Sequence, residues 1–281
     1  MDEEFRRTCL EAVRRALDED LRSEGDITTR ALLPPDMRGR GSIIMREEGV
    51  VAGLPLASMT FRLLDPKLRF QPLVSDGDRP AAPAEIAVVE GRVSTILEGE
   101  RTALNFLQRL SGVATLTSRF VAAAAPHGVE ILDTRKTTPG LRALEKYAVR
   151  AGGGRNHRFG LYDGVLIKDN HIAAVGSTAE AVRRAREVLG NEVSIEVEVQ
   201  DLDELEEAIR AGADVVMLDN LSVEEVREAV RRAGGRVKLE VSGGIDLENV
   251  VAYASTGVDF ISVGALTHSA PALDIALELS V

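Results

Sequence analysis

The stretch SIEVEVQDLDELEEAIRAGADVVMLDNLSVEEVREAVRRAGGRVKLEVSGGI, residues 194–245, decides the fold. Short apolar segments alternate in it with amphipathic ones: 194–199, 202–211, 215–219, 223–233 and 237–241. Apolar residues on both faces of a short segment are typical of a parallel strand buried on each side. A repeat of about 20 to 25 residues has the length of a tight strand–helix unit. The stretch therefore predicts a parallel sheet with helices between its strands.

The same pattern extends outward from this stretch. Further strand candidates lie at 130–134, 164–168 and 260–263, which brings the total to six, and a helix is expected at 247–255. No G-x-G-x-x-G follows a first strand, and no acidic residue is placed to bind a ribose, so a dinucleotide-binding sheet is disfavoured. We expect a TIM-like α/β barrel, incomplete because only six strands are convincing.

The N-terminal part has a different texture. Residues 5–21 place an apolar residue at every fourth position, which predicts an amphipathic helix. Strand-like and helical segments then follow in turn: 42–46, 50–52, 57–64 (helical), 68–73, 86–96 and 100–110 (helical). We interpret residues 1–111 as an N-terminal α+β domain with a mostly antiparallel sheet, ending at Ser111-Gly112. Residues 112–269 form the barrel, and 270–281 are expected as an amphipathic helix that packs back on the N-terminal domain.

The bulk composition is that of a globular protein. The 281 residues carry a net charge of −11, which disfavours binding to nucleic acid or to an anionic membrane surface. No apolar run approaches the roughly 20 residues of a membrane-spanning helix, and the charged first residues do not resemble a signal peptide. Cys9 is the single cysteine, and no His/Cys cluster has the spacing of a zinc site. We expect a cytoplasmic protein.

Positive charge is concentrated in one segment. Between Asp133 and His171 there are eight lysines and arginines against four acids. The four-residue spacing of Arg142, Lys146 and Arg150 suits a solvated helix face. Arg135, Lys136 and Lys168 instead follow strand-like segments, and Gly152-Gly153-Gly154 precedes His157-Arg158. The segment therefore predicts a local site for a small, multiply charged anion.

The predicted strand ends carry charged residues or glycine. In chain order they are Asp133-Thr134-Arg135-Lys136, Lys168-Asp169-Asn170-His171, Glu198, Asp219-Asn220, Ser242-Gly243-Gly244 and Gly264-Ala265. Barrel enzymes place working residues at these ends, and late glycine loops offer backbone N–H groups to phosphate. Ser242-Gly243-Gly244 alone is equally compatible with an ordinary turn. Glu198 and Asp219 suit either Mg²⁺ or acid–base catalysis, and Glu196 and Glu240 leave that assignment open by one position.

Several of these motifs together carry a resemblance to a known family. They are EGERTALNFLQRLSG at 98–112, DTRKTTPGLRALEKYAVRAGGGRNHRFGLYDGVLIKDNH at 133–171, IEVEV at 195–199, VVMLDN at 215–220 and LEVSGGI at 239–245. With GDITT at 25–29 they run through nearly the whole chain, which resembles quinolinate phosphoribosyltransferase. The resemblance implies an N-terminal α/β sandwich and a seven-stranded incomplete barrel. It also implies transfer of phosphoribosyl from phosphoribosyl pyrophosphate to quinolinate, with Mg²⁺, giving nicotinate mononucleotide, pyrophosphate and CO₂ in de novo NAD biosynthesis.

The resemblance also implies the site residues. The matching quinolinate-binding positions are Arg101, Thr134, Arg135, Lys136, His157, Arg158 and Lys168. The matching positions around phosphoribosyl pyrophosphate are Glu198, Asp219, Ser242, Gly243, Gly244, Val263, Gly264, Ala265 and His268. Lys136, Lys168, Glu198 and Asp219 are the implied catalytic residues, and the last two would hold Mg²⁺ directly or through water. A homodimer or larger homo-oligomer with shared active sites is implied, in which Arg101 reaches the partner's pocket.

Three other interpretations are open at this point. A relative with the same scaffold could use a different aromatic acceptor, as in the molybdenum-transport-associated relatives or a nicotinate-type transferase. A barrel aldolase could form a Schiff base on Lys168, but it would have little use for the other cations. A regulatory anion-binding module would be weakened by Glu198 and Asp219 at the same edge of the sheet.

Overall fold

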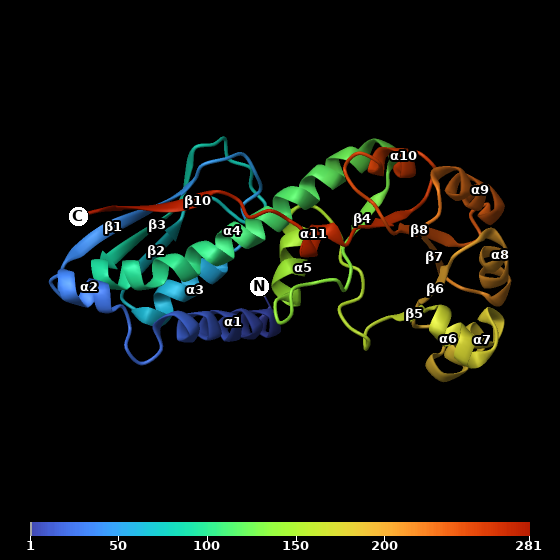
Figure 1. Ribbon diagram of the computed structural model, residues 1–281, viewed down its shortest axis with the longest axis horizontal. Helices are drawn as coiled ribbons and strands as arrows, with labels where there is room; N and C mark the ends of the chain where they lie inside the picture. The colour runs from blue at the N-terminus through green and yellow to red at the C-terminus, as the bar shows by residue number, and fades with distance from the viewer. Residues whose placement is uncertain (1) are drawn as a thin grey trace. The chain divides into compact units, whose positions relative to one another are not determined.

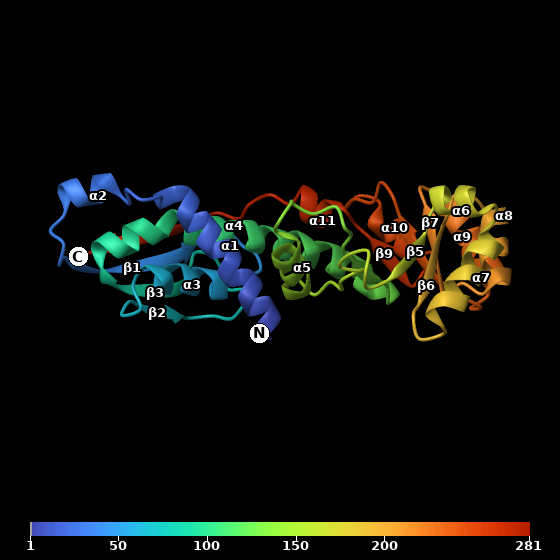
Figure 2. The same cartoon turned by 90° about the horizontal axis from the view of Figure 1, so that it is seen from below.

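The computed structural model describes residues 2–281 of the protein, which form two compact units (Figures 1 and 2). The first unit comprises the chain up to Ser118 together with Thr137–Gly153 and Thr267–Val281. The second unit comprises Arg119–Lys136 and Gly154–Leu266. The chain thus leaves and rejoins the first unit twice.

The first unit is built on an antiparallel sheet. Its elements are α1 (Glu3–Leu21), α2 (Ile27–Leu32), β1 (Arg38–Met45), α3 (Leu54–Leu64), β2 (Arg69–Pro72), β3 (Ala84–Arg92), most of α4 (Val93–Ala124), α5 (Arg142–Ala151) and β10 (Ile275–Ser280). The strand order is β10-β1-β3-β2, and every pairing is antiparallel. Helix α1 packs beside α3, as both views show. The expected N-terminal architecture is confirmed.

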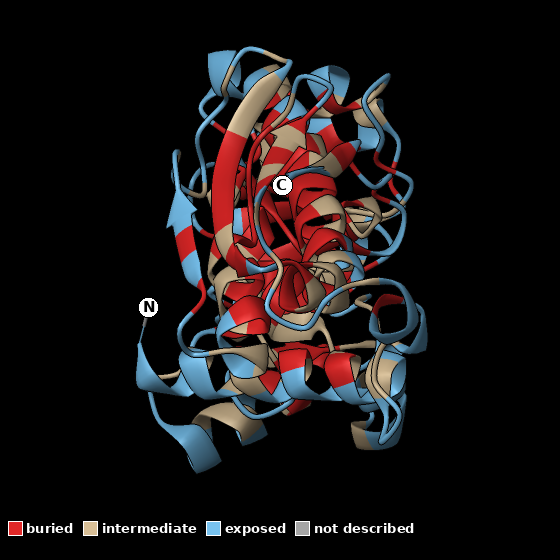
Figure 3. Cartoon of the chain, turned by 90° about the vertical axis from the view of Figure 1, so that its left-hand side faces the viewer, coloured by how far each residue is buried: buried red, intermediate tan, exposed pale blue. Residues whose placement is uncertain are grey.

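The core of this unit lies between the sheet and its helices (Figure 3). Ile43 and Met45 alternate on β1 and are fully buried, because alternate strand residues share a face. They join a cluster with Phe61 of α3, whose ring stacks on Phe70 of β2 with centroids 6.0 Å apart. A Cβ on Gly99 of α4 would come within 2.8 Å of the Phe61 ring, so the glycine allows this close packing.

The C-terminal segment corrects one expectation. Residues 270–281 do not form a helix: β10 pairs with β1 from Met45↔Ile275 to Arg40↔Ser280. Ile275, Leu277 and Leu279 alternate with more polar residues, which is the two-residue period of a strand. The segment covers the open hydrogen-bonding edge of β1 and so returns to the N-terminal sheet.

The expected boundary at Ser111-Gly112 lies inside α4, a single helix of 32 residues. The Ser111 hydroxyl accepts the Ala52 N–H at 3.0 Å, and Thr115 Oγ1 accepts that of Val50 at 2.8 Å. These contacts also explain why residues 50–52 are not the strand that their apolar character suggested. A Cβ on Gly112 would stand 1.9 Å from the Pro271 carbonyl oxygen. The Ser-Gly pair therefore serves close packing on the helix and is not a domain break.

The second unit is an alternation of strands and helices. Its elements are η1 (Ala125–His127), β4 (Glu130–Leu132), β5 (Val165–Ile167), α6 (Asp169–Val175), α7 (Thr178–Leu189), β6 (Ile195–Val199), α8 (Leu202–Ala211), β7 (Val215–Asp219), α9 (Val223–Ala233), β8 (Lys238–Ser242), α10 (Val250–Ala254), β9 (Phe260–Ser262) and the start of α11 (Ala265–His268). The strand order is β4-β9-β8-β7-β6-β5, and all pairings are parallel. Figure 1 shows α8 and α9 covering β6, β7 and β8. The expected fold class is confirmed.

The helices of the repeat begin and end where the sequence signals them. Asp201 accepts the N–H groups of Asp203 and Glu204 at the start of α8, and Gly212 ends that helix in a left-handed conformation. Ser222 and Glu225 form a reciprocal capping box on α9. Six strands are present, where the resemblance implies seven. One isolated parallel bridge, Leu132↔Arg155, adds a seventh extended segment beside β4.

No helix within residues 2–281 combines the length and apolar character needed to cross a membrane.

Candidate active site

The parallel strands of the second unit end at a common edge of their sheet. In register, Ile167 of β5 pairs with Val197 of β6, so the next residues, Lys168 and Glu198, stand side by side. Asp219 and Ser242 are likewise partners across β7 and β8. Residues predicted from separate strand ends are therefore brought together by the register.

Lys168 and Glu198 form a direct ion pair between Nζ and Oε2. The lysine side chain retains 42% of its exposure, whereas the glutamate retains 12%. Lys168 is also the N-cap residue of α6, and its backbone N–H donates to His171 Nδ1 at 3.0 Å. The pair thus places a cation at an exposed strand end and holds it with a largely buried acid.

Behind this edge, His157 contacts two buried glutamates. Its Nε2 lies 2.9 Å from Glu196 Oε2 and 3.7 Å from Glu240 Oε2. The register places Glu240 beside Met217 and thus in the row of Glu198, while Glu196 lies on the same face of β6 two residues earlier. Burial raises the pKa of the Glu240 carboxyl, and the neighbouring Glu196 charge raises it further. Two acids and one imidazole therefore share a nearly dry space.

The loop before β5 is fastened to β4. The fully buried Asp133 accepts the backbone N–H of His157 at 2.9 Å and the Asn156 side-chain amide at 2.5 Å. Asp133 directly follows β4, so this carboxylate ties the first cation-bearing strand end to the His157-Arg158 loop. Asp133 therefore anchors the backbone of this loop to the end of β4.

Arg158 is held at its guanidinium as well as at its backbone. Its Nη1 donates to the Gly164 carbonyl at 3.0 Å. Burial lowers the pKa of Arg158, and the nearby charge of Arg135 lowers it further. Thr134 Oγ1 accepts the Lys136 N–H at 3.0 Å, which shapes the turn that carries both cations. The two arginines are close enough to repel each other, as two cations gathered for an anion would be.

The turn after β7 packs tightly against the loop after β8. Asn220 has a left-handed φ of 57°, donates its N–H to the Ser242 carbonyl at 2.9 Å, and bonds Asp219 Oδ2 at 2.8 Å. Gly243 has a φ of 97°, and a Cβ there would lie 2.2 Å from Asn220 Oδ1. Gly243 is thus required by both conformation and space.

The glycine loops are ordered by local hydrogen bonds. Asn249 Nδ2 donates to the Gly244 carbonyl at 2.9 Å and its Oδ1 accepts the Asp246 N–H at 3.0 Å. Because this turn occupies residues 246–249, α10 begins at Val250 and not at residue 247 as expected. After β9, Val263 donates its N–H to the Leu132 carbonyl at 2.9 Å, and Gly264 leads into α11 at Ala265.

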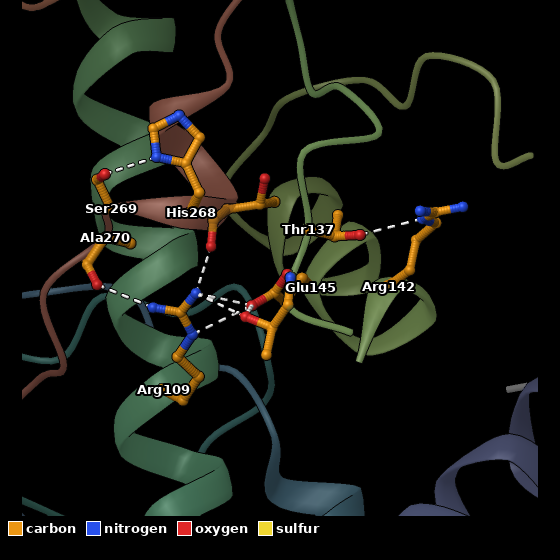
Figure 4. Close-up of polar contacts among 9 residues, drawn as sticks. Arg109, Thr137, Arg142, Glu145, His268, Ser269 and Ala270 are labelled. Atoms are coloured by element: carbon orange, nitrogen blue, oxygen red, sulfur yellow. Dashed lines mark hydrogen bonds and ion pairs between the residues drawn. The ribbon is translucent and has the colours of Figure 1, made fainter. Parts of the chain in front are cut away.

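Two of the expected site residues belong to the first unit. Arg101 is an exposed residue of α4. His268 ends α11, and its Nδ1 is 2.6 Å from the neighbouring Ser269 Oγ (Figure 4). Figure 4 also shows the adjacent Arg109, which bonds the Ala270 carbonyl at 3.0 Å and Glu145 Oε1 at 2.7 Å.

One prediction for the cationic segment was wrong, because Lys146 does not lie on a solvated helix face. Lys146 is fully buried, because α5 packs against its surroundings on most of its faces, so the four-residue spacing does not mark a solvated surface. Arg155 pairs with Glu130 at the opposite end of β4, with Nη1 2.6 Å from Oε2, and lies over the Phe260 ring. Neither residue therefore contributes to the strand-end site within the second unit.

Sequence reasoning gave Asp133 and Asn156 no role, and it named Glu196 and Glu240 only as alternatives for the acidic positions of the site. The available signal was the strand period, which puts Glu196 and Glu198 on one face of β6. Nothing in the sequence placed His157 against β6 and β8, because that contact depends on the path of the loop.

The fold and the site define a class: an α/β enzyme whose parallel strands end in cations, acids and glycine loops at a common edge of the sheet. The family models for the C-terminal and N-terminal domains of quinolinate phosphoribosyl transferase match residues 113–278 and 26–111. The chain belongs to the quinolinate phosphoribosyltransferase family.

Individual relatives agree with this membership. A probable nicotinate-nucleotide pyrophosphorylase [carboxylating] of Bacillus subtilis is 47% identical over 256 residues, covering 91% of this chain and 88% of the relative. The nicotinate-nucleotide pyrophosphorylase [carboxylating] of Mycobacterium leprae is 45% identical and covers 96% of both chains. The solved structure of the nicotinate-nucleotide pyrophosphorylase from Francisella tularensis has a TM-score of 0.94 and 46% identity, covering 98% of this chain and 97% of the other.

Proposed function

We propose that this protein transfers the phosphoribosyl group of phosphoribosyl pyrophosphate to quinolinate. Quinolinate loses CO₂ in the process, and the products are nicotinate mononucleotide and pyrophosphate, as in de novo NAD biosynthesis. The observation that carries the proposal is the Lys168–Glu198 pair, in a chain of this family. It lies at the same edge of the parallel sheet as the end of β4, which leads into Arg135 and Lys136. Family membership over both domains supports the reaction, and the charge pattern supports the substrate.

Quinolinate is a dianion, so its binding site must supply positive charge. Arg135, Lys136, Arg158 and Lys168 provide this charge, and Arg groups match carboxylates with two parallel hydrogen bonds. Thr134 and His157 complete the set within the second unit, and Arg101 is proposed to reach the pocket from a partner subunit. Exclusion of water from such a pocket strengthens each of these interactions.

The proposed chemistry needs no nucleophile from the protein. The pyridine nitrogen attacks the anomeric carbon of the ribose with its lone pair, and the carbon–oxygen bond to pyrophosphate breaks with both electrons going to pyrophosphate. Positive charge that develops on the ribose is offset by Glu198 and Asp219. The ring nitrogen is then cationic, so the adjacent carboxylate leaves as CO₂ and its electron pair stays on a carbon beside that charge until a proton replaces it.

The glycine loops are proposed to hold the 5′-phosphate. Ser242-Gly243-Gly244 and Val263-Gly264-Ala265 follow neighbouring strands β8 and β9, and His268 lies just beyond. Backbone N–H groups in loops without bulky side chains can approach a phosphate closely. Lys136 and Lys168 would offset the charge of the reacting groups.

Magnesium fits the donor set as part of this proposal. Glu198 and Asp219 offer the oxygen ligands that Mg²⁺ prefers. In proteins this ion commonly binds only one or two carboxylates, and substrate phosphates and water supply its other ligands. Glu198 is engaged by Lys168, which favours contact with the ion through water or through Asp219. A bound Mg²⁺ would neutralise the pyrophosphate charge.

The remaining parts of the proposal concern architecture and assembly. We propose a cytoplasmic homodimer, or a larger homo-oligomer, in which each pocket is completed by Arg101 of the partner. The six parallel strands and the bridge at Arg155 are proposed to curve into an incomplete barrel.

The test of this function is release of CO₂ from carboxyl-labelled quinolinate. The expected result is release that requires both phosphoribosyl pyrophosphate and Mg²⁺. Turnover of nicotinate without turnover of quinolinate would instead assign the protein to a different acceptor. A covalent adduct at Lys168 after borohydride treatment with substrate would assign it to Schiff-base chemistry.

A further inference from the structure

The Glu196 and Glu240 carboxylates, which His157 contacts, have no part in the chemistry proposed above. Glu196 and Glu240 are 8% and 1% exposed, and each has one carboxylate oxygen, Oε1, that is buried without a hydrogen-bond partner. Such groups are costly to bury, since each unpaired polar atom loses its hydration. Two acids also oppose the binding of an anion nearby. Because burying these two acids beside a cationic site is unfavourable, we expect their side chains to have a function.

The hydrogen bonds of His157 define its proton position. Its Nδ1 accepts the backbone N–H of Arg158 at 2.8 Å, so this nitrogen carries no proton. The proton of the neutral ring is therefore on Nε2, which donates to Glu196 Oε2 at 2.9 Å. Both ring nitrogens are engaged inside the protein.

The same arrangement decides between two uses of the cluster. One imidazole and two carboxylates, with ligand atoms within 4.8 Å of one another, are also a donor set for a divalent metal ion. A metal on Nε2 would require the proton on Nδ1, where it would face the Arg158 N–H. The hydrogen bonding thus favours a protonated Nε2 over a metal ligand.

The ring connects the two glutamates to Arg158. Through Nδ1 it holds the Arg158 backbone, while Asp133 holds the His157 N–H and Gly164 holds the Arg158 guanidinium. A rotation of the ring would release the backbone N–H of the residue whose guanidinium is proposed to bind a substrate carboxylate. A misplacement of about 1 Å in such a group can lower activity about 100-fold.

We propose that Glu196 and Glu240 are positioning residues: they fix the orientation and tautomer of His157, and through it the placement of Arg158 for the carboxylate of an aromatic acid. This inference rests on the function proposed above. Glu196 acts as the acceptor of the Nε2 proton, and the Glu240 carboxyl lies 3.7 Å from the same nitrogen, on β8. A carboxamide can replace Glu196 in this role because its oxygen still accepts that proton, whereas a methyl group cannot.

The test compares Glu196→Gln with Glu196→Ala, with Glu192→Gln as the control for loss of an exposed acid in the same unit. We expect Glu196→Ala to raise the KM for quinolinate about tenfold or more and to change kcat less. Glu196→Gln and Glu192→Gln should each stay within about threefold of the wild type. Nitrogen-15 NMR of labelled histidine should show an Nε2–H tautomer for His157 in the wild type and in Glu196→Gln, assigned by its loss in His157→Gln.

Three results would overturn the inference. One is equal damage by Glu196→Gln and Glu196→Ala, which would mean that the charge matters and not the hydrogen bond. The second is a His157 with its proton on Nδ1. The third is one equivalent of a divalent transition metal in the purified protein that is lost in Glu196→Gln. A wild type that binds but does not turn over quinolinate would overturn the proposed function alone, because the NMR tautomer still tests the positioning role.

Discussion

Two buried glutamates, one in each unit, differ in whether hydrogen bonds and an opposite charge satisfy their carboxylates. Glu145 of α5 is fully buried, and Arg109 binds it while the Thr138 N–H and hydroxyl donate to it at 2.9 and 2.7 Å. Glu240 of β8 is almost equally buried, but no arginine or lysine pairs with it among the described residues, the neighbouring Glu196 charge raises its pKa, and one of its oxygens has no hydrogen-bond partner. A satisfied buried acid organises its fold, whereas an unsatisfied one lowers stability and indicates a functional constraint.

The strongest test of this contrast is Glu145→Ala. Removal of the acid leaves the Arg109 guanidinium without its charge partner and releases the Thr138 loop from α5. Loss of one partner of a buried ion pair typically lowers the free energy of unfolding by about 3 to 5 kcal/mol. Urea unfolding followed by circular dichroism measures this loss for the first unit.

A matched variant removes the charge at Glu145 but keeps the shape of the side chain. Glu145→Gln retains one acceptor oxygen for Thr138 and loses the second acceptor and the charge that Arg109 requires, so its loss of stability should lie between those of the wild type and Glu145→Ala. Equal stability of all three proteins would show that the satisfied acid does not organise the first unit, and the contrast with Glu240 would fail.

The Lys168–Glu198 pair sharpens the comparison, because it is satisfied but open to solvent on the lysine side. An ion pair with an exposed partner contributes only about 0 to 1 kcal/mol, so stability does not explain it. We expect Lys168→Ala to lower kcat/KM for quinolinate on the order of 100-fold. Thermal unfolding should change little, and steady-state kinetics gives the first quantity.

Lys238 provides the control for this substitution. It forms a similar pair with Asp259, but at the start of β8 and thus at the other end of the strands, with 64% of its side chain exposed. Lys238→Ala should leave kcat/KM within about twofold of the wild type. Comparable losses in both lysine variants would contradict a catalytic edge at the strand ends.

The sequence predicted the parallel sheet well and the borders of the first unit poorly. The second unit follows a repeated local pattern, so periodicity and capping residues such as Ser222 locate its elements. In the first unit, Gly112 resembled a domain boundary. The glycine is needed because the Pro271 carbonyl packs against it, and Pro271 lies far along the chain, where a local pattern cannot reveal the contact. The segment at 270–281 was ambiguous on local grounds, and only the open edge of β1 decides that it is a strand.

The site shows the same division between local and distant information. Strand-end reasoning placed Lys168 beside Glu198, because register follows from the strands themselves. The contacts of His157 could not be predicted, since they depend on a loop fastened by Asp133 to another strand. Sequence thus identifies which residue types stand at the edge, whereas the supporting network behind it requires the structure.

The smallest expected effect is the pH dependence of stability that Glu240 confers. Burial and the Glu196 charge raise its pKa from 4.5 to about 8. The folded state therefore binds this proton more tightly than the unfolded state, and the contribution is fully favourable below about pH 4.5 and is lost as pH rises through about 8. Wild-type Tm should fall by a few degrees between pH 6 and pH 9, beyond the change common to the rest of the chain.

Glu240→Gln keeps the shape of the protonated acid without its titration, so its Tm should fall less over the same interval. Parallel Tm curves for the two proteins would mean that Glu240 titrates alike in both states, and its contrast with Glu145 would then lie in hydrogen bonding alone.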